Sequence, residues 1–266
     1  MSFVENNIDG VVFMTAPNID TTHAFTTRNG GISKGIYESL NLARHAGDDP
    51  GDVKENYTLL CRALKITADD IICSTQVHGT HIRIVSPDDR GRLLKSDLHQ
   101  ADGLITNSTG VALMVFTADC VPVLLYDPEK NVAGAVHAGW RGTVANITGI
   151  TIKKMVNEFG CSPAGIKAAI GPCISKCCFE TDADVANAVY DSLPEDADRC
   201  LSRHGAKYMI DLKEANRIFL SKAGLGDISI SDECTSCLTE KYWSHRKTRG
   251  HRGSQAAVIA IRETCS

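Results

Sequence analysis

Short runs of apolar residues, separated by polar turns, predict buried β-strands in the middle of the chain. The runs cover residues 111–116, 121–126 and 132–136, and their length and their valine and leucine content favour strands over helices. The sequence Asp-Pro-Glu-Lys-Asn at 127–131 is typical of a turn. Cys120 lies where the first run breaks, and His137 follows the third. Because a strand end lets a side chain leave the core, both are candidates for a site in a cleft.

The rest of the chain mixes strands and helices without strict alternation. Apolar runs predict further strands, and three- and four-residue spacing predicts helices. The expected strands are 11–15, 23–27, 71–77, 81–85, 165–170, 227–230 and 256–261, and the expected helices are 51–64, 143–159, 182–193 and 212–222. The polar segment 87–100 is interpreted as a surface excursion. This pattern argues against a Rossmann fold or a TIM barrel, and the chain has neither a dinucleotide-binding nor a P-loop motif.

A second histidine, His78, follows another short apolar run. Together with Cys120 and His137 it would give two imidazoles and one thiolate at separate strand ends, a set that suits catalytic zinc with an open fourth position. The gaps of 42 and 17 residues match no short ligand motif, so the fold would have to build the site. The alternative from spacing alone is that Cys120 is a small buried hydrophobe and that the histidines are hydrogen-bonded core or loop residues.

Composition and charge describe an ordinary globular protein. Apolar residues make up 43% and charged residues 23% of the 266 residues, and the net charge is −4. This charge gives no reason to expect a nucleic-acid or membrane-surface partner. The basic run at 241–252 is interpreted as a solvated loop or as part of an anion-binding rim. Neither a signal peptide nor an apolar run of membrane-spanning length is recognisable, so we expect a cytoplasmic protein.

Eleven cysteines are a large and odd number. In a cytoplasmic protein they are expected to be free thiols rather than a disulfide framework. A second, structural zinc site is the alternative for Cys173, Cys177, Cys178, Cys234 and Cys237. Their C-x3-C-C spacing is atypical of known zinc ribbons, so free thiols are the preferred interpretation.

Several segments together resemble one family. QVHGT, ADGLITN, ADCVPVLLYD and AVHAGWRG occur in this order, with TRNGGISKGIYESLNLARHAGDDPGDVKEN, IGPCISKCCFE and CTSCLTEKYWSHRKTRGHRGSQA outside the centre. These motifs are similar to those of the YfiH family, also called the multicopper polyphenol oxidase (laccase-type) family, over about residues 26–261. The resemblance implies that residues 1–266 form one α/β/β/α layered sandwich with a mixed sheet. It also implies that His78, Cys120 and His137 are the metal ligands, with zinc as the expected metal and copper as the alternative.

The family resemblance also implies an activity. Its members catalyse phosphorolysis of adenosine, inosine, guanosine and methylthioadenosine, and hydrolytic deamination of adenosine. The expected partners are therefore a purine nucleoside and phosphate, bound by a monomer or a homodimer. The cytidine-deaminase signature H-x-E…P-C-x-x-C is absent from the chain.

Further residues are candidates for contacts in such a site. An anion-binding role is expected for arginines near glycines and for the helix start after Gly142, and Trp140 could stack on a planar substrate. Asp119, beside Cys120, could orient a ligand histidine, act as an acid–base group, or simply make a structural hydrogen bond. The candidates for substrate or phosphate contacts are Arg28, Asn41, Gln76, Trp140, Arg141 and Arg246.

Three other functions remain open from the sequence. A copper oxidase acting on phenols would fit the older family name, although the chain has nine histidines and no H-x-H. A cysteine hydrolase would use Cys120 as the nucleophile and His137 as the base. A zinc-binding scaffold without catalytic activity is the third.

Overall fold

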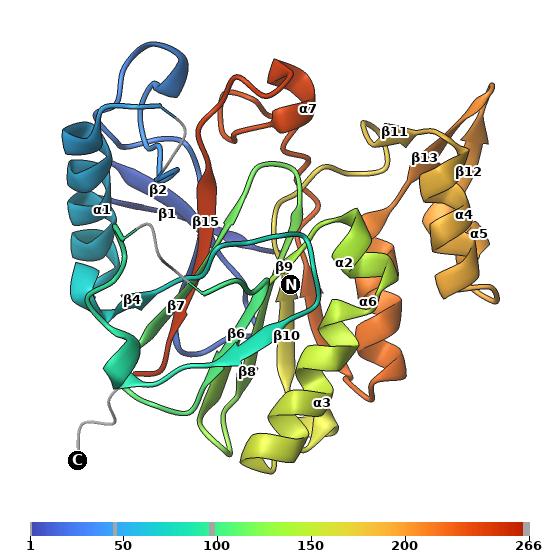
Figure 1. Cartoon of the computed structure of the whole chain (residues 1–266), viewed down its shortest axis with the longest axis horizontal. Helices are drawn as coiled ribbons and strands as arrows, with labels where there is room; N and C mark the ends of the chain where they lie inside the picture. Colours follow the sequence, from blue (N-terminus) through green and yellow to red (C-terminus); the bar gives the residue numbers. More distant parts are fainter. Residues whose placement is uncertain (1, 45–46, 96–98, 263–266) are drawn as a thin grey trace.

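Two six-stranded mixed sheets form the centre of the molecule (Figure 1). The computed structural model describes residues 2–44, 47–95 and 99–262. The first sheet has the strand order β1 (Val4–Ile8), β2 (Val11–Thr15), β3 (Thr22–Thr26), β15 (Gln255–Ala260), β7 (Ala112–Thr117), β4 (Ile71–Ile72). The second has the order β14 (Asp227–Ile230), β10 (Lys167–Ile170), β8 (Val121–Asp127), β9 (Val132–Ala138), β6 (Gly103–Thr106), β5 (Ile82–Ile84).

Three layers of apolar side chains hold the sheets and helices together. The helix α1 (Pro50–Leu64) covers the outer face of the first sheet. The helices α3 (Ile147–Phe159) and α6 (Leu212–Lys222) cover the outer face of the second. The third layer lies between the sheets and includes Leu113 and Leu124, which are fully buried. This arrangement is the α/β/β/α sandwich that the family resemblance implied.

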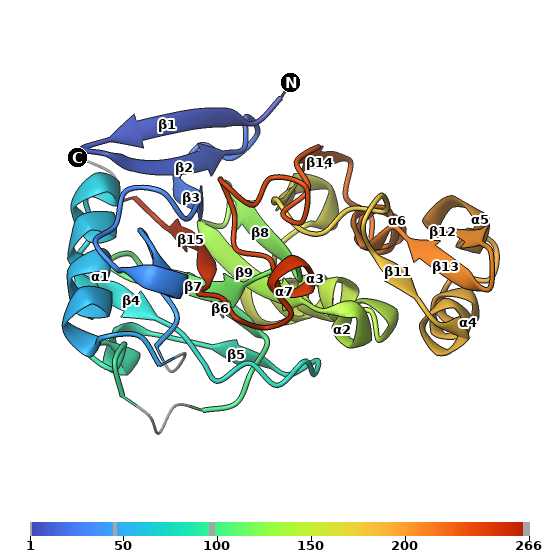
Figure 2. The same ribbon diagram turned by 90° about the horizontal axis from the view of Figure 1, so that it is seen from above.

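A small lobe extends from the end of the molecule opposite α1, as both views show (Figure 2). It contains a three-stranded sheet and two short helices. These elements are β11 (Glu180–Thr181), α4 (Ala183–Ser192), α5 (Ala197–Cys200), β12 (Leu201–His204) and β13 (Lys207–Ile210). The loop that enters the lobe from β10 carries Cys177 and Cys178.

Where caps reinforce the periodic pattern, the predicted boundaries agree well with the structure. The strands β2 and β14 and the helix α6 have the predicted bounds. The Asp211 side chain caps α6 by accepting from the Glu214 N–H at 3.0 Å. Gly160 ends α3 in the left-handed region, with a φ of 67°.

Two predicted elements differ in the structure. The strand expected at 71–77 is limited to β4, because Thr75 exchanges backbone hydrogen bonds with His99 and Ala101 rather than with β7. The helix expected at 143–159 is divided into α2 (Trp140–Val144) and α3, since Asn146 has a φ of 58° and caps α3 through the Gly149 N–H. A five-residue helix lacks the length for the dipole site expected after Gly142.

The surface excursion predicted for 87–100 is only partly on the surface. Leu93 is buried against the core of the first sheet, and residues 96–98 lie outside the described residues. The pattern also missed β1, β6 and the strands of the lobe. No helix among the described residues is long and apolar enough to cross a membrane.

Candidate metal centre

His78, Cys120 and His137 meet at one end of the second sheet. Cys120 lies in the crossover from β7 to β8, which carries the chain from the first sheet to the second. His137 is the penultimate residue of β9 and is paired with Pro122 of β8, so the β8–β9 ladder places it near Cys120. His78 comes from the loop between β4 and β5. The sheet topology thus brings together residues that are far apart in sequence.

The three side chains surround one point. Their ligand atoms all lie within 4.8 Å of one another. The Cys120 Sγ is 3.9 Å from the His78 Nε2, and the two imidazole rings are 4.9 Å apart in an edge-to-face arrangement. His78 has a φ of 58°, in the left-handed region that non-glycine residues rarely adopt. Such strain is common at functional sites, where the surrounding structure enforces it.

Asp102 fixes two of the three ligand-bearing segments, although sequence reasoning did not single it out. Its fully buried carboxylate accepts from the backbone N–H groups of Val77, His78 and Gly79, at 3.1, 3.0 and 2.8 Å. It also bonds the His137 Nδ1 at 2.8 Å. Because the Nδ1 is used in this contact, the Nε2 is the His137 atom left to bind a metal ion. The available signal was the aspartate within the ADGLITN motif, since carboxylates commonly orient metal-binding histidines.

The charges of the cluster favour a thiolate. Burial alone would raise the pKa of Cys120, but the facing imidazoles of His137 and His78 lower it to about 6. Burial alone would lower the pKa of His137, but Cys120 and Asp102 raise it to about 9. The sulfur is therefore a good metal ligand near neutral pH, and a bound cation would replace the proton on His137.

The cluster lies in the wall of a cavity of about 540 Å³. Small-molecule sites commonly have volumes of about 300–1,000 Å³, so the cavity suits a ligand of nucleoside size. Gln76 lines it, and its side-chain amide is bonded to the backbone N–H and carbonyl of Phe116, both at 2.7 Å. Phe116 also lines the cavity and is only half-buried.

Two arginines that the sequence analysis did not select line the cavity. Arg44 has its guanidinium carbon 5.6 Å from the centre of the Phe116 ring. Arg252 bonds the Gly253 carbonyl and the Ser254 hydroxyl through Nη1, while its buried Nε has no acceptor among the described residues. Of the basic run at 241–252, only Gly250, His251 and Arg252 line this cavity.

Five of the predicted contact residues do not line this cavity. The Arg28 guanidinium stacks on Trp243 at 4.0 Å and donates to the Thr239 carbonyl at 3.0 Å. The Asn41 side chain is buried and accepts from the Ser254 N–H. Trp140 packs against the core of the second sheet, and the exposed Arg141 stacks on it at 4.3 Å. The fifth, Arg246, donates to the carbonyls of Cys178 and Glu180. Arg28, Arg141 and Arg246 thus make contacts away from this cavity.

Asp119 is part of the scaffold beside the ligands. Its carboxylate accepts from the Thr235 and Ser244 hydroxyls at 2.7 and 3.0 Å and from the Arg246 N–H at 2.6 Å. The structural hydrogen bond, one of the three roles considered for this residue, matches these contacts. The orienting role considered for Asp119 belongs to Asp102 instead.

The donor set fits a borderline-soft cation such as zinc. Two imidazoles and a thiolate are ligands that zinc accepts, and three protein ligands leave a fourth position open. A tetrahedral ion with bonds of about 2.1–2.3 Å needs donor atoms roughly 3.5 Å apart, and only small movements separate the observed arrangement from that value. The set also suits copper, so it does not decide between the two metals.

Comparisons with known proteins identify the family. The chain belongs to the family described as "Multi-copper polyphenol oxidoreductase laccase", whose model matches residues 22–262. A "Purine nucleoside phosphorylase" from Deinococcus radiodurans is 40% identical over 252 residues, which cover 95% of this chain and 94% of that protein. "Purine nucleoside phosphorylase YlmD" from Geobacillus stearothermophilus is 38% identical over 244 residues, covering 90% and 89%. "Adenosine deaminase RL5", from an unknown prokaryotic organism, is 32% identical over 242 residues, covering 87% and 91%.

The fold agrees with the same relationship. The crystal structure of YlmD from Geobacillus stearothermophilus superposes with a TM-score of 0.92 at 36% identity, covering 97% of this chain and 98% of that chain. That of Bacillus licheniformis YfiH gives 0.91 at 32% identity, covering 97% and 99%. The resemblance to the YfiH family is confirmed.

Proposed function

We propose that this protein is a zinc-dependent purine nucleoside phosphorylase that also deaminates adenosine. The observation that carries the proposal is the convergence of His78, Cys120 and His137 in the wall of a cavity of nucleoside size. Relatives named for both activities support the choice of substrate. We expect inosine, adenosine, guanosine and methylthioadenosine as substrates.

Residues around the cavity have distinct roles in this proposal. The half-buried ring of Phe116 offers a face for the purine. Arg252 and Arg44 both line the cavity and supply positive charge for phosphate. Asp102 holds His137 in one orientation. A bound zinc ion supplies a Lewis acid at the place where these groups meet.

Removal of one ligand should abolish both reactions. We expect Cys120→Ala and His137→Ala to lose the phosphate-dependent release of hypoxanthine from inosine and the conversion of adenosine to inosine, because three protein ligands leave little redundancy. The measurements are product formation by chromatography and bound metal by elemental analysis. Cys161→Ala, which removes a buried thiol outside the cavity, should retain both activities. Full activity in both ligand variants would refute the proposal.

A cysteine hydrolase is the second candidate, because the order Cys120, His137, Asp102 has the arrangement of a nucleophile, a base and an orienting carboxylate. Metal-free protein distinguishes the two functions. Ester hydrolysis that survives chelation and is abolished by a thiol-reactive inhibitor would favour the hydrolase. Copper-dependent oxidation of a phenol without purine release would favour the oxidase instead.

A further inference from the structure

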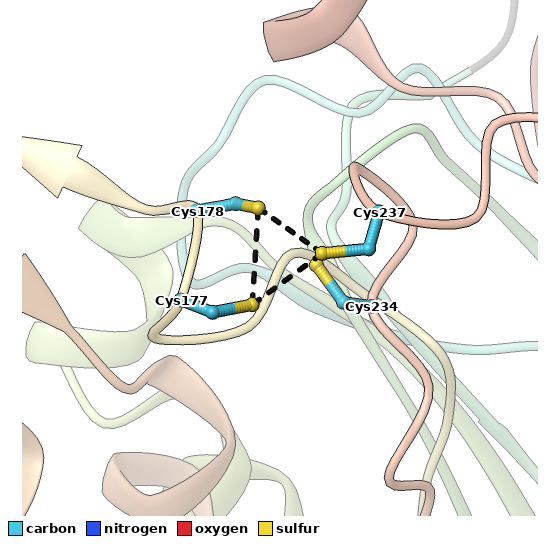
Figure 3. A group of neighbouring side chains, drawn as sticks. All are labelled: Cys177, Cys178, Cys234 and Cys237. Atoms are coloured by element: carbon cyan, nitrogen blue, oxygen red, sulfur yellow. Dashed lines mark hydrogen bonds between the residues drawn. The ribbon is translucent and has the colours of Figure 1, made fainter.

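Four cysteines from two loops gather outside the metal centre described above. Cys177 and Cys178 lie between β10 and β11, and Cys234 and Cys237 lie between β14 and α7 (His245–Thr248). Their sulfur atoms all lie within 4.8 Å of one another. Figure 3 shows the four side chains directed toward a common centre from opposite sides. Nothing in the proposed reaction uses them.

The sulfur separations match the geometry of one shared ion. The Sγ–Sγ distances are 3.8 Å for Cys177–Cys178, 3.6 Å for Cys177–Cys237 and 3.3 Å for Cys178–Cys237. A tetrahedral zinc ion with Zn–S bonds of about 2.3 Å places its sulfurs about 3.8 Å apart. A disulfide would join only two sulfurs, at about 2.05 Å. Four sulfur atoms that are all close to one another therefore suit one shared zinc ion better than a disulfide between two of them.

The backbone around Cys234 is built to hold a thiolate. The Ser175 N–H donates to the Cys234 sulfur at 3.3 Å, and the N–H groups of Ser236 and Cys237 also face it. The last two belong to the tight C-x2-C turn, which is closed by the Cys237 N–H and the Cys234 carbonyl at 3.2 Å. Such donors stabilise sulfur as an anion, and the C-x2-C spacing is common in structural zinc sites.

The solvent exposure of the cluster and the charge of its thiolates also favour a bound metal ion. Cys177 and Cys237 are exposed, so an ion can reach the cluster from solvent. Deprotonated, the four sulfurs would carry four negative charges at close range, which a divalent cation offsets. Cys173, the fifth cysteine considered from the sequence, is fully buried and its thiol donates to the Ile174 carbonyl. It stands outside the group.

We propose that Cys177, Cys178, Cys234 and Cys237 bind a second, structural zinc ion. This ion would join the two loops that carry its ligands. Both loops hold Asp119, the residue before Cys120: the Ile174 N–H donates to the Asp119 carbonyl at 3.0 Å, and Thr235 donates to its carboxylate. The second ion would therefore stiffen the turn that presents Cys120, without touching the cavity. The proposal does not depend on which reaction the cavity supports.

Metal stoichiometry tests the proposal. Protein purified under reducing conditions and equilibrated with Zn²⁺ should retain two ions per chain after gel filtration. Cys237→Ser should retain one, and Cys120→Ala should also retain one, because each variant disrupts a different site. Cys61→Ala, a buried thiol of α1 outside both groups, should retain two. Substitution with Co²⁺ identifies the remaining site, because a four-thiolate site gives strong sulfur-to-cobalt charge transfer that Cys120→Ala keeps and Cys237→Ser loses.

The result that overturns the proposal is a single ion in the wild-type protein and none in Cys120→Ala. A disulfide among the four cysteines in freshly reduced, zinc-equilibrated protein, detected by mass spectrometry, would also overturn it. If Cys237→Ser fails to fold, the Cys120→Ala protein decides the question alone. One thiolate-bound Co²⁺ in that variant supports the second site, and no bound Co²⁺ rejects it.

Discussion

At the scale of single residues, Asp102 links the ligand loop to the ligand strand. It is fully buried, yet it accepts three backbone N–H bonds from residues 77–79 and one bond from His137. Burial would raise its pKa, but the His137 contact and the backbone donors lower it, so the group is ionised at neutral pH. The same negative charge orients His137 and holds His78 in its left-handed conformation.

We predict that Asp102→Asn weakens metal binding without removing a ligand. An amide cannot accept all four bonds with the strength of a carboxylate, and loss of such supporting partners typically lowers metal affinity about 10–100-fold. Competition with a calibrated chelator measures the change. Asp127→Asn is the matched control, because Asp127 is equally buried and accepts the N–H groups of Glu129 and Lys130 away from the centre. If Asp102→Asn bound the metal as tightly as the wild-type protein, Asp102 would not be needed to support the ligands.

Replacement of Arg252 and replacement of Arg28 should have different effects. Arg252→Ala should raise the KM for phosphate, because the positively charged Arg252 side chain lines the cavity. We expect an increase of about tenfold, the effect of losing one charge-assisted hydrogen bond of roughly 1.5 kcal/mol. Arg28→Ala should instead lower the melting temperature, because it removes the contact with Trp243. Steady-state kinetics at varied phosphate separate the two. If Arg28→Ala raised the KM for phosphate and Arg252→Ala did not, Arg28 would be the phosphate-binding residue, as the sequence predicted.

At the scale of secondary-structure elements, the join between β9 and α2 shapes the metal centre. Gly139 follows the strand that carries His137 and is the N-cap of α2. A Cβ atom at this position would lie 2.8 Å from the His78 Cδ2 and 3.3 Å from the Cys120 Sγ. The glycine of the A-G-W segment is therefore required by the close approach of two ligands.

We predict that Gly139→Ala lowers metal affinity about tenfold or more, because the new methyl group displaces the His78 ring from the position that the ion needs. Isothermal titration with Zn²⁺ measures the loss. Gly165→Ala is the control, since a Cβ there meets nothing within 4 Å and its backbone is not left-handed. Equal affinity in the two variants would show that the site adapts to the added group.

Whether an element could be predicted from the sequence depended on the strength of its local pattern. The strands β8 and β9 and the helix α6 have strong local patterns, and their caps and turns mark the ends. The strands of the lobe were missed because they are short, most of their side chains are exposed or half-buried, and they show no apolar alternation. Arg44 and Arg252 were missed for a different reason. They are more than 200 residues apart, and their segments meet through contacts such as the hydrogen bond from the Leu42 N–H to the Ser254 carbonyl at 3.0 Å.

At the scale of the whole molecule, the last described strand occupies the middle of the first sheet. β15 pairs with β3 on one side and with β7 on the other, so the sheet is not complete until the end of the chain is in place. Its side chains are buried on both faces: Val258 contributes to the core under α1, and Ile259 contributes to the core between the sheets. The β7–β8 crossover that carries Cys120 begins beside this strand.

We therefore predict that a chain ending at Gly253 does not fold. It loses the burial of Val258 and Ile259, about 1.5–3 kcal/mol each, and two ladders of hydrogen bonds at roughly 1 kcal/mol per bond. The sum is comparable to a typical total stability of about 5–15 kcal/mol, and β3 and β7 would be left as unpaired, aggregation-prone edges. Circular dichroism and size-exclusion chromatography measure the outcome. A chain ending at Arg262 keeps every described strand and should fold like the full chain. A folded, metal-binding protein that ends at Gly253 would show that β15 is dispensable.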